Sequence, residues 1–118
     1  MQIKGEFDER IILNAQAIRD TNPVTTEKVK LQGIGKKGLF VYNGLDQNVT
    51  VQIQGCYTES GTYINVGTAQ TVNTAVNAII GENEVVQLKN YFPYLQAVVT
   101  AALAPITGTI TVAAVKSF

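Results

Sequence analysis

The clearest pattern of apolar and polar positions lies in residues 49–54, where every second side chain is apolar. The apolar members are Val49, Val51 and Ile53, and the polar members are Thr50, Gln52 and Gln54. Successive side chains of a strand point to opposite faces, so this period of two predicts a strand with one buried face and one wet face. The same alternation of apolar residues with threonine predicts a final strand over residues 109–114.

Short apolar runs separated by turn-forming residues continue along the chain. Further strands are expected at residues 10–18, 39–42, 62–66, 85–88 and 95–100. Turn signals rich in Gly, Pro, Asn, Asp or Ser fall at residues 22–23, 33–38, 44–48, 58–61, 81–83 and 104–108. Residues 39–42 are apolar on both faces, and we expect them to form a hairpin with residues 49–54. About seven or eight short strands predict an all-β fold, an antiparallel β-sandwich of the jelly-roll or Ig-like kind.

Residues 67–83 carry a competing signal, because Ala69, Val72, Val76 and Ile79 recur at helical spacing. The same stretch is rich in Thr, Val and Asn, which are poor helix formers. Extended structure with irregular stretches is therefore the prediction for this region.

A chain of 118 residues is long enough for one domain with its own core and too short for two. We divide it into an N-terminal arm and first strand, residues 1–20, and a single β-sandwich domain, residues 21–118. Residues 1–9 mix charged and apolar side chains and are expected to form the extended arm.

Charge is low and balanced, with nine basic and nine acidic residues and a formal net charge of zero. The basic residues are dispersed, and only Lys36 and Lys37 are adjacent. Nucleic-acid binding needs a concentrated positive field, so it is disfavoured. A net charge near zero removes long-range repulsion between copies and permits self-association.

The redox and targeting signals point to synthesis in a cytoplasm. Cys56 is the single cysteine, so no intrachain disulfide can form. The charged start does not resemble a signal peptide, and no apolar run is long enough to span a membrane.

The absence of histidine from the sequence removes the usual general base and the commonest transition-metal ligand, so we expect neither an enzyme nor a cofactor. Gly33, Gly35 and Gly38 match the dinucleotide-binding glycine spacing, but they precede a strand rather than a helix, which favours a simple turn. The carboxylate pairs Asp8/Glu9 and Glu82/Glu84 lack the spacing of a calcium loop. Cys56 has no neighbouring base in the sequence to activate it.

Residues 91–94 (YFPY) form the strongest local feature. Aromatic side chains either close the end of a sandwich or anchor a partner, and both interpretations fit this corner.

The strand motifs, taken in order, resemble a known group of proteins. They are residues 11–15 (IILNA), 38–42 (GLFVY), 49–55 (VTVQIQG), 60–63 (SGTY), 66–67 (VG), 92–100 (FPYLQAVVT) and 104–112 (APITGTITV). This order resembles the small β-sandwich virion proteins of tailed bacteriophages, of the capsid decoration or cement type, and covers nearly the whole chain.

The resemblance implies a non-enzymatic structural protein on the outer surface of a capsid, made in the host cytoplasm. Its expected partners are the major capsid protein or another virion protein and further copies of itself, with a trimer matching the three-fold sites of a shell. The arm and the aromatic corner supply the expected contact residues: Ile3, Phe7, Ile11, Ile12, Tyr91, Phe92 and Tyr94.

Two alternatives remain open. One is a carbohydrate-binding or adhesive module that meets sugar hydroxyls with Asn, Gln and Thr faces. The sequence has no tryptophan, so its five tyrosines would supply the stacking surface. The other is a head–tail or tail component of the virion.

Overall fold

A computed structural model describes residues 7–30, 37–80 and 93–117, and every regular element in these ranges is a β-strand. Four strands form sheet A: β1 (Phe7–Gln16), β4 (Lys37–Asn43), β8 (Asn77–Ile80) and β10 (Ile110–Ser117). Six form sheet B: β2 (Val24–Thr25), β3 (Val29–Lys30), β5 (Val49–Cys56), β6 (Ile64–Asn65), β7 (Gln70–Val72) and β9 (Tyr94–Ala101). The part of the chain described here contains no helix that could cross a membrane.

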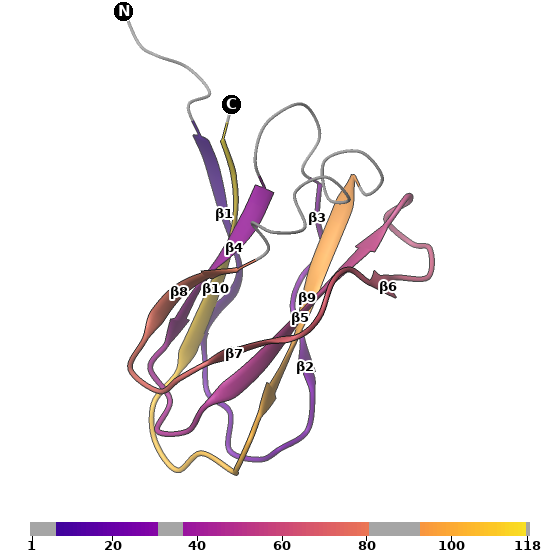
Figure 1. The fold of residues 1–118 in the computed structure, drawn as a ribbon. Coiled ribbons are helices and arrows are strands. Elements are labelled where there is room, and N and C mark those ends of the chain that lie inside the picture. Colours follow the sequence, from indigo (N-terminus) through magenta and orange to yellow (C-terminus); the bar gives the residue numbers. More distant parts are fainter. Residues whose placement is uncertain (1–6, 31–36, 81–92, 118) are drawn as a thin grey trace, which may run out of the picture.

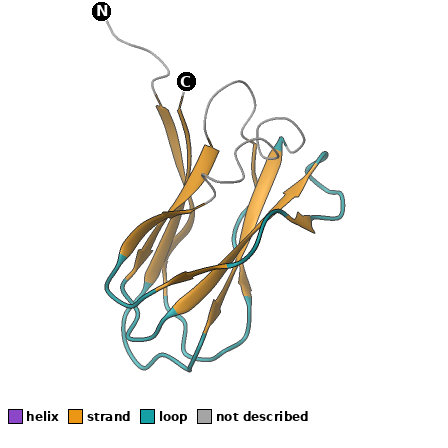
Figure 2. Ribbon diagram, in the orientation of Figure 1, coloured by secondary structure: helices purple, strands orange, loops and turns teal. Residues whose placement is uncertain are grey.

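The two sheets lie face to face (Figures 1 and 2). The strand order of sheet A is β1-β10-β4-β8, and that of sheet B is β2-β9-β5-β6, with β3 also on β9 and β7 also on β5. Every pairing is antiparallel. The predicted antiparallel β-sandwich is confirmed.

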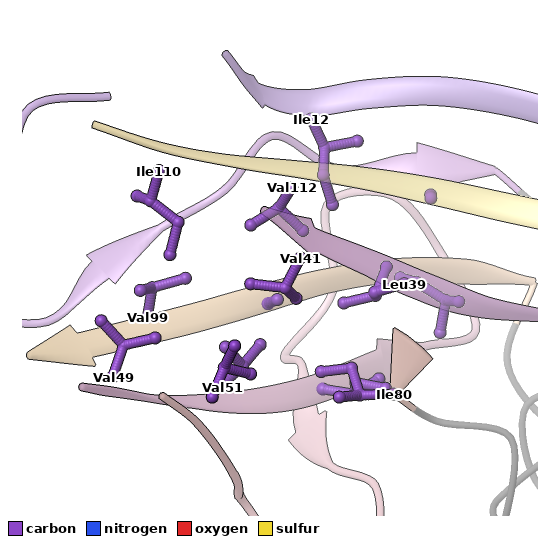
Figure 3. Packing of buried hydrophobic residues seen from close by; sticks show 14 of the residues in the cluster. Ile12, Leu39, Val41, Val49, Val51, Ile80, Val99, Ile110 and Val112 are labelled. Atoms are coloured by element: carbon purple, nitrogen blue, oxygen red, sulfur yellow. The ribbon is translucent and has the colours of Figure 1, made fainter. Parts of the chain in front are cut away.

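The core fills the space between the inner faces of the two sheets (Figure 3). Val49, Val51 and Ile53 of β5 are buried while the residues between them are not, as the alternation in the sequence predicted. β9 alternates in the same way, with Leu95, Ala97, Val99 and Ala101 buried. Sheet A contributes Ile12, Leu39, Val41, Ile80, Ile110, Val112 and Ala114 to the same cluster.

The expected hairpin between residues 39–42 and 49–54 is wrong. β4 belongs to sheet A and β5 to sheet B, so the chain crosses from one sheet to the other between them. β4 pairs with β10 and β8 instead. β4 is therefore an inner strand of sheet A, between β10 and β8.

Asn43, the last residue of β4, holds this crossover in place. It is only 1% exposed, and its side-chain Nδ2 donates to the carbonyls of Gln47 (3.1 Å), Val72 (3.1 Å) and Asn73 (3.2 Å). Its Oδ1 accepts a hydrogen bond from the backbone N–H of Leu45 at 3.1 Å. One buried amide therefore joins the β4–β5 crossover, which leaves sheet A, to the β7–β8 crossover, which returns to it.

Residues 67–80 are extended and irregular rather than helical, as predicted. β7 pairs with β5 in sheet B and β8 with β4 in sheet A, so this stretch bridges the two sheets. The turn between them includes Ala75 at a φ of 61°. Residues 81–83 and the strand expected at 85–88 lie outside the described residues.

The first strand begins at Phe7, three residues before its expected start at Arg10. β1 pairs with β10 from Phe7 opposite Ser117 to Gln16 opposite Ile110, so residues 7–9 belong to sheet A rather than to an arm. The two ends of the described chain thus lie side by side (Figure 1). Residues 1–6 are outside the description.

Gly108 occupies a position that no other residue fits. Its φ is +91°, and a Cβ added to it would lie 2.0 Å from the carbonyl oxygen of Gly44. This close approach belongs to the corner where the N–H of Gly44 donates to the carbonyl of Thr109 at 2.9 Å and Arg19 Nη1 donates to the carbonyl of Gly108 at 2.9 Å. The glycine therefore lets the β4–β5 and β9–β10 connections touch.

Replacing the buried amide should destabilise the whole sandwich. We expect Asn43→Ala to lower the free energy of unfolding by about 2–4 kcal/mol, because it orphans buried backbone groups in both crossovers. Urea unfolding followed by fluorescence measures it. The control is Asn48→Ala, whose exposed Oδ1 accepts from the N–H of Thr74 at 2.9 Å and can be replaced by water. Equal losses in the two variants would contradict the role of Asn43.

Adding a Cβ at Gly108 should also destabilise the fold. We expect Gly108→Ala to lower the free energy of unfolding by about 2 kcal/mol or more. The alanine Cβ would be strained at a φ of +91° and would clash with the carbonyl of Gly44. Thermal unfolding compares it with Thr107→Ala, an exposed neighbour in the same loop. A Tm equal to that of the control would show that the two connections are not in contact.

Candidate interaction surface

The outer face of sheet A carries a row of apolar side chains that crosses all four strands. The pairing register aligns Ile11 of β1 with Ala113 of β10, Ala113 with Phe40 of β4, and Phe40 with Ile79 of β8. Residues opposite one another in an antiparallel sheet share a face. We call Ile11, Ala113, Phe40 and Ile79 the apolar row.

The apolar row points away from the core. The next row of paired residues belongs entirely to the buried cluster. It pairs Ala114 with Leu39 and Leu39 with Ile80. Side chains alternate between faces along each strand, so the row occupies the opposite side of the sheet. At the two ends of the row, Ile11 is 46% exposed and Ile79 is 47% exposed. Between them, Phe40 is partly buried and the small side chain of Ala113 is only 1% exposed.

Aromatic packing extends the row. The rings of Phe40 and Tyr42 are stacked, with centroids 6.1 Å apart and an interplanar angle of 24°. Tyr42 shares its register with Thr111 and Asn77, so it lies on the same outer face, where it is 38% exposed. Four strands spaced about 4.8 Å apart make the row about 14 Å wide, which is enough for the centre of a protein contact.

The edge of sheet A next to the row is irregular. The pairing of β1 with β10 shifts register between Ile11 and Leu13 and again between Leu13 and Gln16. Ala15 has a φ of 46°, and its N–H donates to Thr111 Oγ1 at 2.9 Å instead of to a strand partner. Bulges of this kind interrupt an edge strand and discourage uncontrolled pairing with another chain. Only the first half of β1 keeps a regular edge.

The structure separates the contact residues predicted from the sequence. Ile11 lies in the apolar row, whereas Ile12 is 1% exposed and packs in the core, which leaves it no surface for a partner. Phe7 is the first residue of β1. Tyr94 is half-buried at the start of β9 in sheet B, so it lies on the other sheet from Ile11. Ile3, Tyr91 and Phe92 fall outside the described residues.

Sequence reasoning missed Phe40, Ile79 and Tyr42 as surface residues. A signal was present, since residues 39–42 are apolar on both faces and Ile79 and Ile80 are adjacent apolar residues. A strand in a two-layer sandwich needs only one apolar face for the core, so the second one marks a surface. What the pattern lacked was the register that lines these residues up with Ile11.

The other chemical candidates are scattered. Among the described ranges, no three Cys, Asp or Glu side chains gather to hold a metal ion. Asp8 and Glu9 lie in β1, while Gly33, Gly35, Glu82 and Glu84 are outside the description. The Cys56 thiol is buried, with its Sγ 4.0 Å from Thr58 Oγ1. Gly38 is a strand residue of β4 rather than part of a turn.

A separate apolar feature lies on the connection between β9 and β10. Leu103 and Ile106 are both largely exposed there. The loop is held by Asp46, whose Oδ1 accepts from the N–H of Ile106 at 3.0 Å and whose own N–H donates to the carbonyl of Thr107 at 3.3 Å. These are two side chains on a loop, whereas the apolar row is continuous across a sheet.

Comparisons with known proteins support the fold. Neither protein families nor curated proteins give a match. Among solved structures, the PBSX exported protein XepA aligns with a TM-score of 0.68 and 15% identity over 94% of this chain, which spans 37% of the length of XepA. PirA aligns with a TM-score of 0.51 and 14% identity, covering 99% of this chain and 100% of PirA. At these identities the likeness concerns the fold alone.

The apolar row should be dispensable for folding. We expect the double variant Ile11→Thr and Ile79→Thr to change the free energy of unfolding by less than about 1 kcal/mol, because both residues are exposed and Thr suits a strand. Leu39→Ala, on the buried face of the same sheet, should cost about 2–5 kcal/mol. Urea unfolding compares the two. A loss in the double variant as large as in Leu39→Ala would mean that the row is packed as part of the fold.

Proposed function

We propose that this protein is a non-enzymatic structural component of a bacteriophage virion, a decoration protein that binds the outer capsid surface through sheet A and stabilises the shell. The observation that carries the proposal is the apolar row, whose residues are aligned across the outer face of sheet A and whose ends, Ile11 and Ile79, are exposed. Apolar side chains aligned across a rigid sheet form a ready contact centre at low entropic expense, because the strands are already ordered.

The phage assignment draws on the order of strand motifs along the sequence. The fold likeness to the PBSX exported protein XepA over 94% of this chain is consistent with it. The low and balanced charge also fits, since a shell protein must sit beside many copies of itself without repulsion.

Repetition makes a small contact sufficient. A stable pairwise interface buries about 800 Å² on each partner, and the row can form only the apolar centre of such an area. A shell offers the same site many times, and linked copies gain avidity without new contacts. We therefore propose that the protein binds as a homo-oligomer, a trimer on the three-fold sites of the shell, with the major capsid protein as its partner.

The N-terminal segment is proposed as a second grip. β1 is the outer strand of sheet A, and residues 1–6 continue the chain from its regular end. We propose that these residues add a strand to a neighbouring subunit.

A charge placed in the apolar row should abolish binding to the shell. We expect Ile79→Lys to weaken co-sedimentation with undecorated capsids by about 30-fold or more, because an ammonium buried against an apolar contact loses about 2 kcal/mol or more. Thr71→Lys, on an exposed strand position of sheet B, is the matched control and should bind normally. Equal binding by both variants would rule out sheet A as the docking face.

Removing residues 1–6 tests the second grip in the same assay, with weaker binding expected and normal binding excluding it. Light scattering of the free protein measures the oligomer. Electron microscopy of purified particles locates the protein, and density confined to the tail would replace shell decoration by a tail role.

A further inference from the structure

The outer face of sheet B differs in chemistry from that of sheet A. The register places its members opposite one another across β2, β9, β5, β6 and β7. They are Thr25, Thr50, Gln52, Gln54, Asn65, Thr71, Gln96, Val98 and Thr100, which we call the polar face. These nine residues include no charged side chain, and all except Val98 carry an amide or a hydroxyl. Lys30 of β3, opposite Tyr94, is a charged residue at the end of the same outer face.

The amides of the polar face are already ordered. Gln96 Nε2 donates to Gln54 Oε1 at 2.7 Å, and Gln54 Nε2 donates to Asn65 Oδ1 at 3.0 Å, so a chain of hydrogen bonds crosses β9, β5 and β6. Gln52 Nε2 is held by the carbonyls of Val66 and Gly67, both at 3.3 Å. Side chains held in this way lose little rotamer freedom when a ligand binds. Among the described residues, Gln96 Oε1 accepts no hydrogen bond and Asn65 Nδ2 donates none, so both can bond to a ligand.

Aromatic rings bound one end of the polar face. Tyr94 begins β9 opposite Cys56, and Tyr63 lies close to both. The ammonium groups of Lys28 and Lys30 lie over the rings of Tyr63 (5.3 Å) and Tyr94 (5.7 Å). Tyr63 donates its hydroxyl to the carbonyl of Glu59 at 3.0 Å.

Partial burial, reinforced by the charges of Cys56, Glu59 and Tyr94, raises the pKa of Tyr63 above its usual value of 10.0. A tyrosine hydroxyl is protonated, and so a donor, at neutral pH even without this rise. Tyr57, which directly follows β5, is 79% exposed.

We propose that the polar face binds a neutral polysaccharide lying along β5 and β9. Sugar hydroxyls both donate and accept, which matches amide groups that do the same. The C–H faces of sugar rings pack on an aromatic ring such as Tyr94, which shares the outer face of β9 with Gln96. The path from Tyr94 to Thr100 is about 20 Å long by strand rise, which accommodates several sugar units.

Other ligand classes fit the polar face less well. A nucleic acid or an acidic glycan needs concentrated positive charge, and Lys28 and Lys30 are at one end with their ammonium groups over tyrosine rings. A ligand with an apolar surface would leave the amides and hydroxyls of the polar face without hydrogen-bond partners. The inference concerns sheet B and is independent of the proposed docking through sheet A.

A glycan array and affinity electrophoresis of the full chain test the inference, with gels containing dextran, xylan, galactomannan or mixed-linkage β-glucan. We expect retardation by at least one neutral polysaccharide. The double variant Gln54→Ala and Gln96→Ala should weaken it at least about tenfold, because ordered hydrogen-bonding groups are removed. Tyr94→Ala should weaken it as well. Ile79→Thr, on the apolar row, is the control and should bind as the unchanged protein does.

Three results would overturn the inference. The first is the absence of any neutral glycan bound above background. The second is unchanged affinity in the double amide variant, with thermal unfolding showing that it is folded. The third is binding limited to acidic glycans and lost at high salt, which would assign the affinity to Lys28 and Lys30. None of these results bears on capsid co-sedimentation, so the two proposals fail separately.

Discussion

The sandwich depends on a buried amide that ties together two passages of the chain between its sheets. A chain that leaves one sheet for the other must turn through the edge of the core, where backbone groups lose both water and strand partners. Asn43 supplies both donors and an acceptor at that point, satisfying carbonyls of Gln47, Val72 and Asn73 and the N–H of Leu45. No buried side-chain nitrogen or oxygen in the described residues is left without a partner. The two sheets can therefore meet with an apolar core between them, and each is left with an outer face free to differ.

Local alternation was enough to predict the sandwich and the inner faces of β5 and β9, because the period of two is a property of each strand by itself. The hairpin between residues 39–42 and 49–54 was wrong for a physical reason. Strands that are neighbours in sequence usually pair, and residues 44–48 resemble a hairpin turn. Here, however, the Asn43 side chain bonds the backbone at Leu45 and Val72 and so stabilises a crossover between the sheets. The start of β1 was misplaced by three residues because Asp8 and Glu9 look solvated, although edge strands tolerate such residues.

The candidate surface could be predicted only in part. Ile11 was expected as a contact residue because it lies near the N-terminus, but its neighbour Ile12 turned out to be core. Phe40 and Ile79 become surface partners of Ile11 only through the pairing of strands far apart in the sequence, which no local pattern contains. The polar face was foreseen as a kind of surface, made of Asn, Gln and Thr, without its location. The row of hydrogen-bonded amides across β9, β5 and β6 again depends on the pairing register of these strands.

The uncharged character of the polar face has a consequence for particles rather than for single molecules. A shell covered through sheet A would turn sheet B toward the medium, so each particle would be coated with hydrated amides and hydroxyls. Coatings of this kind keep colloids apart by holding water, whereas charged coats do so by a repulsion that salt screens. Suspensions of such particles would then keep their dispersion across a wide range of ionic strength, and contact between a particle and another surface would be governed by hydrogen-bonding chemistry at close range.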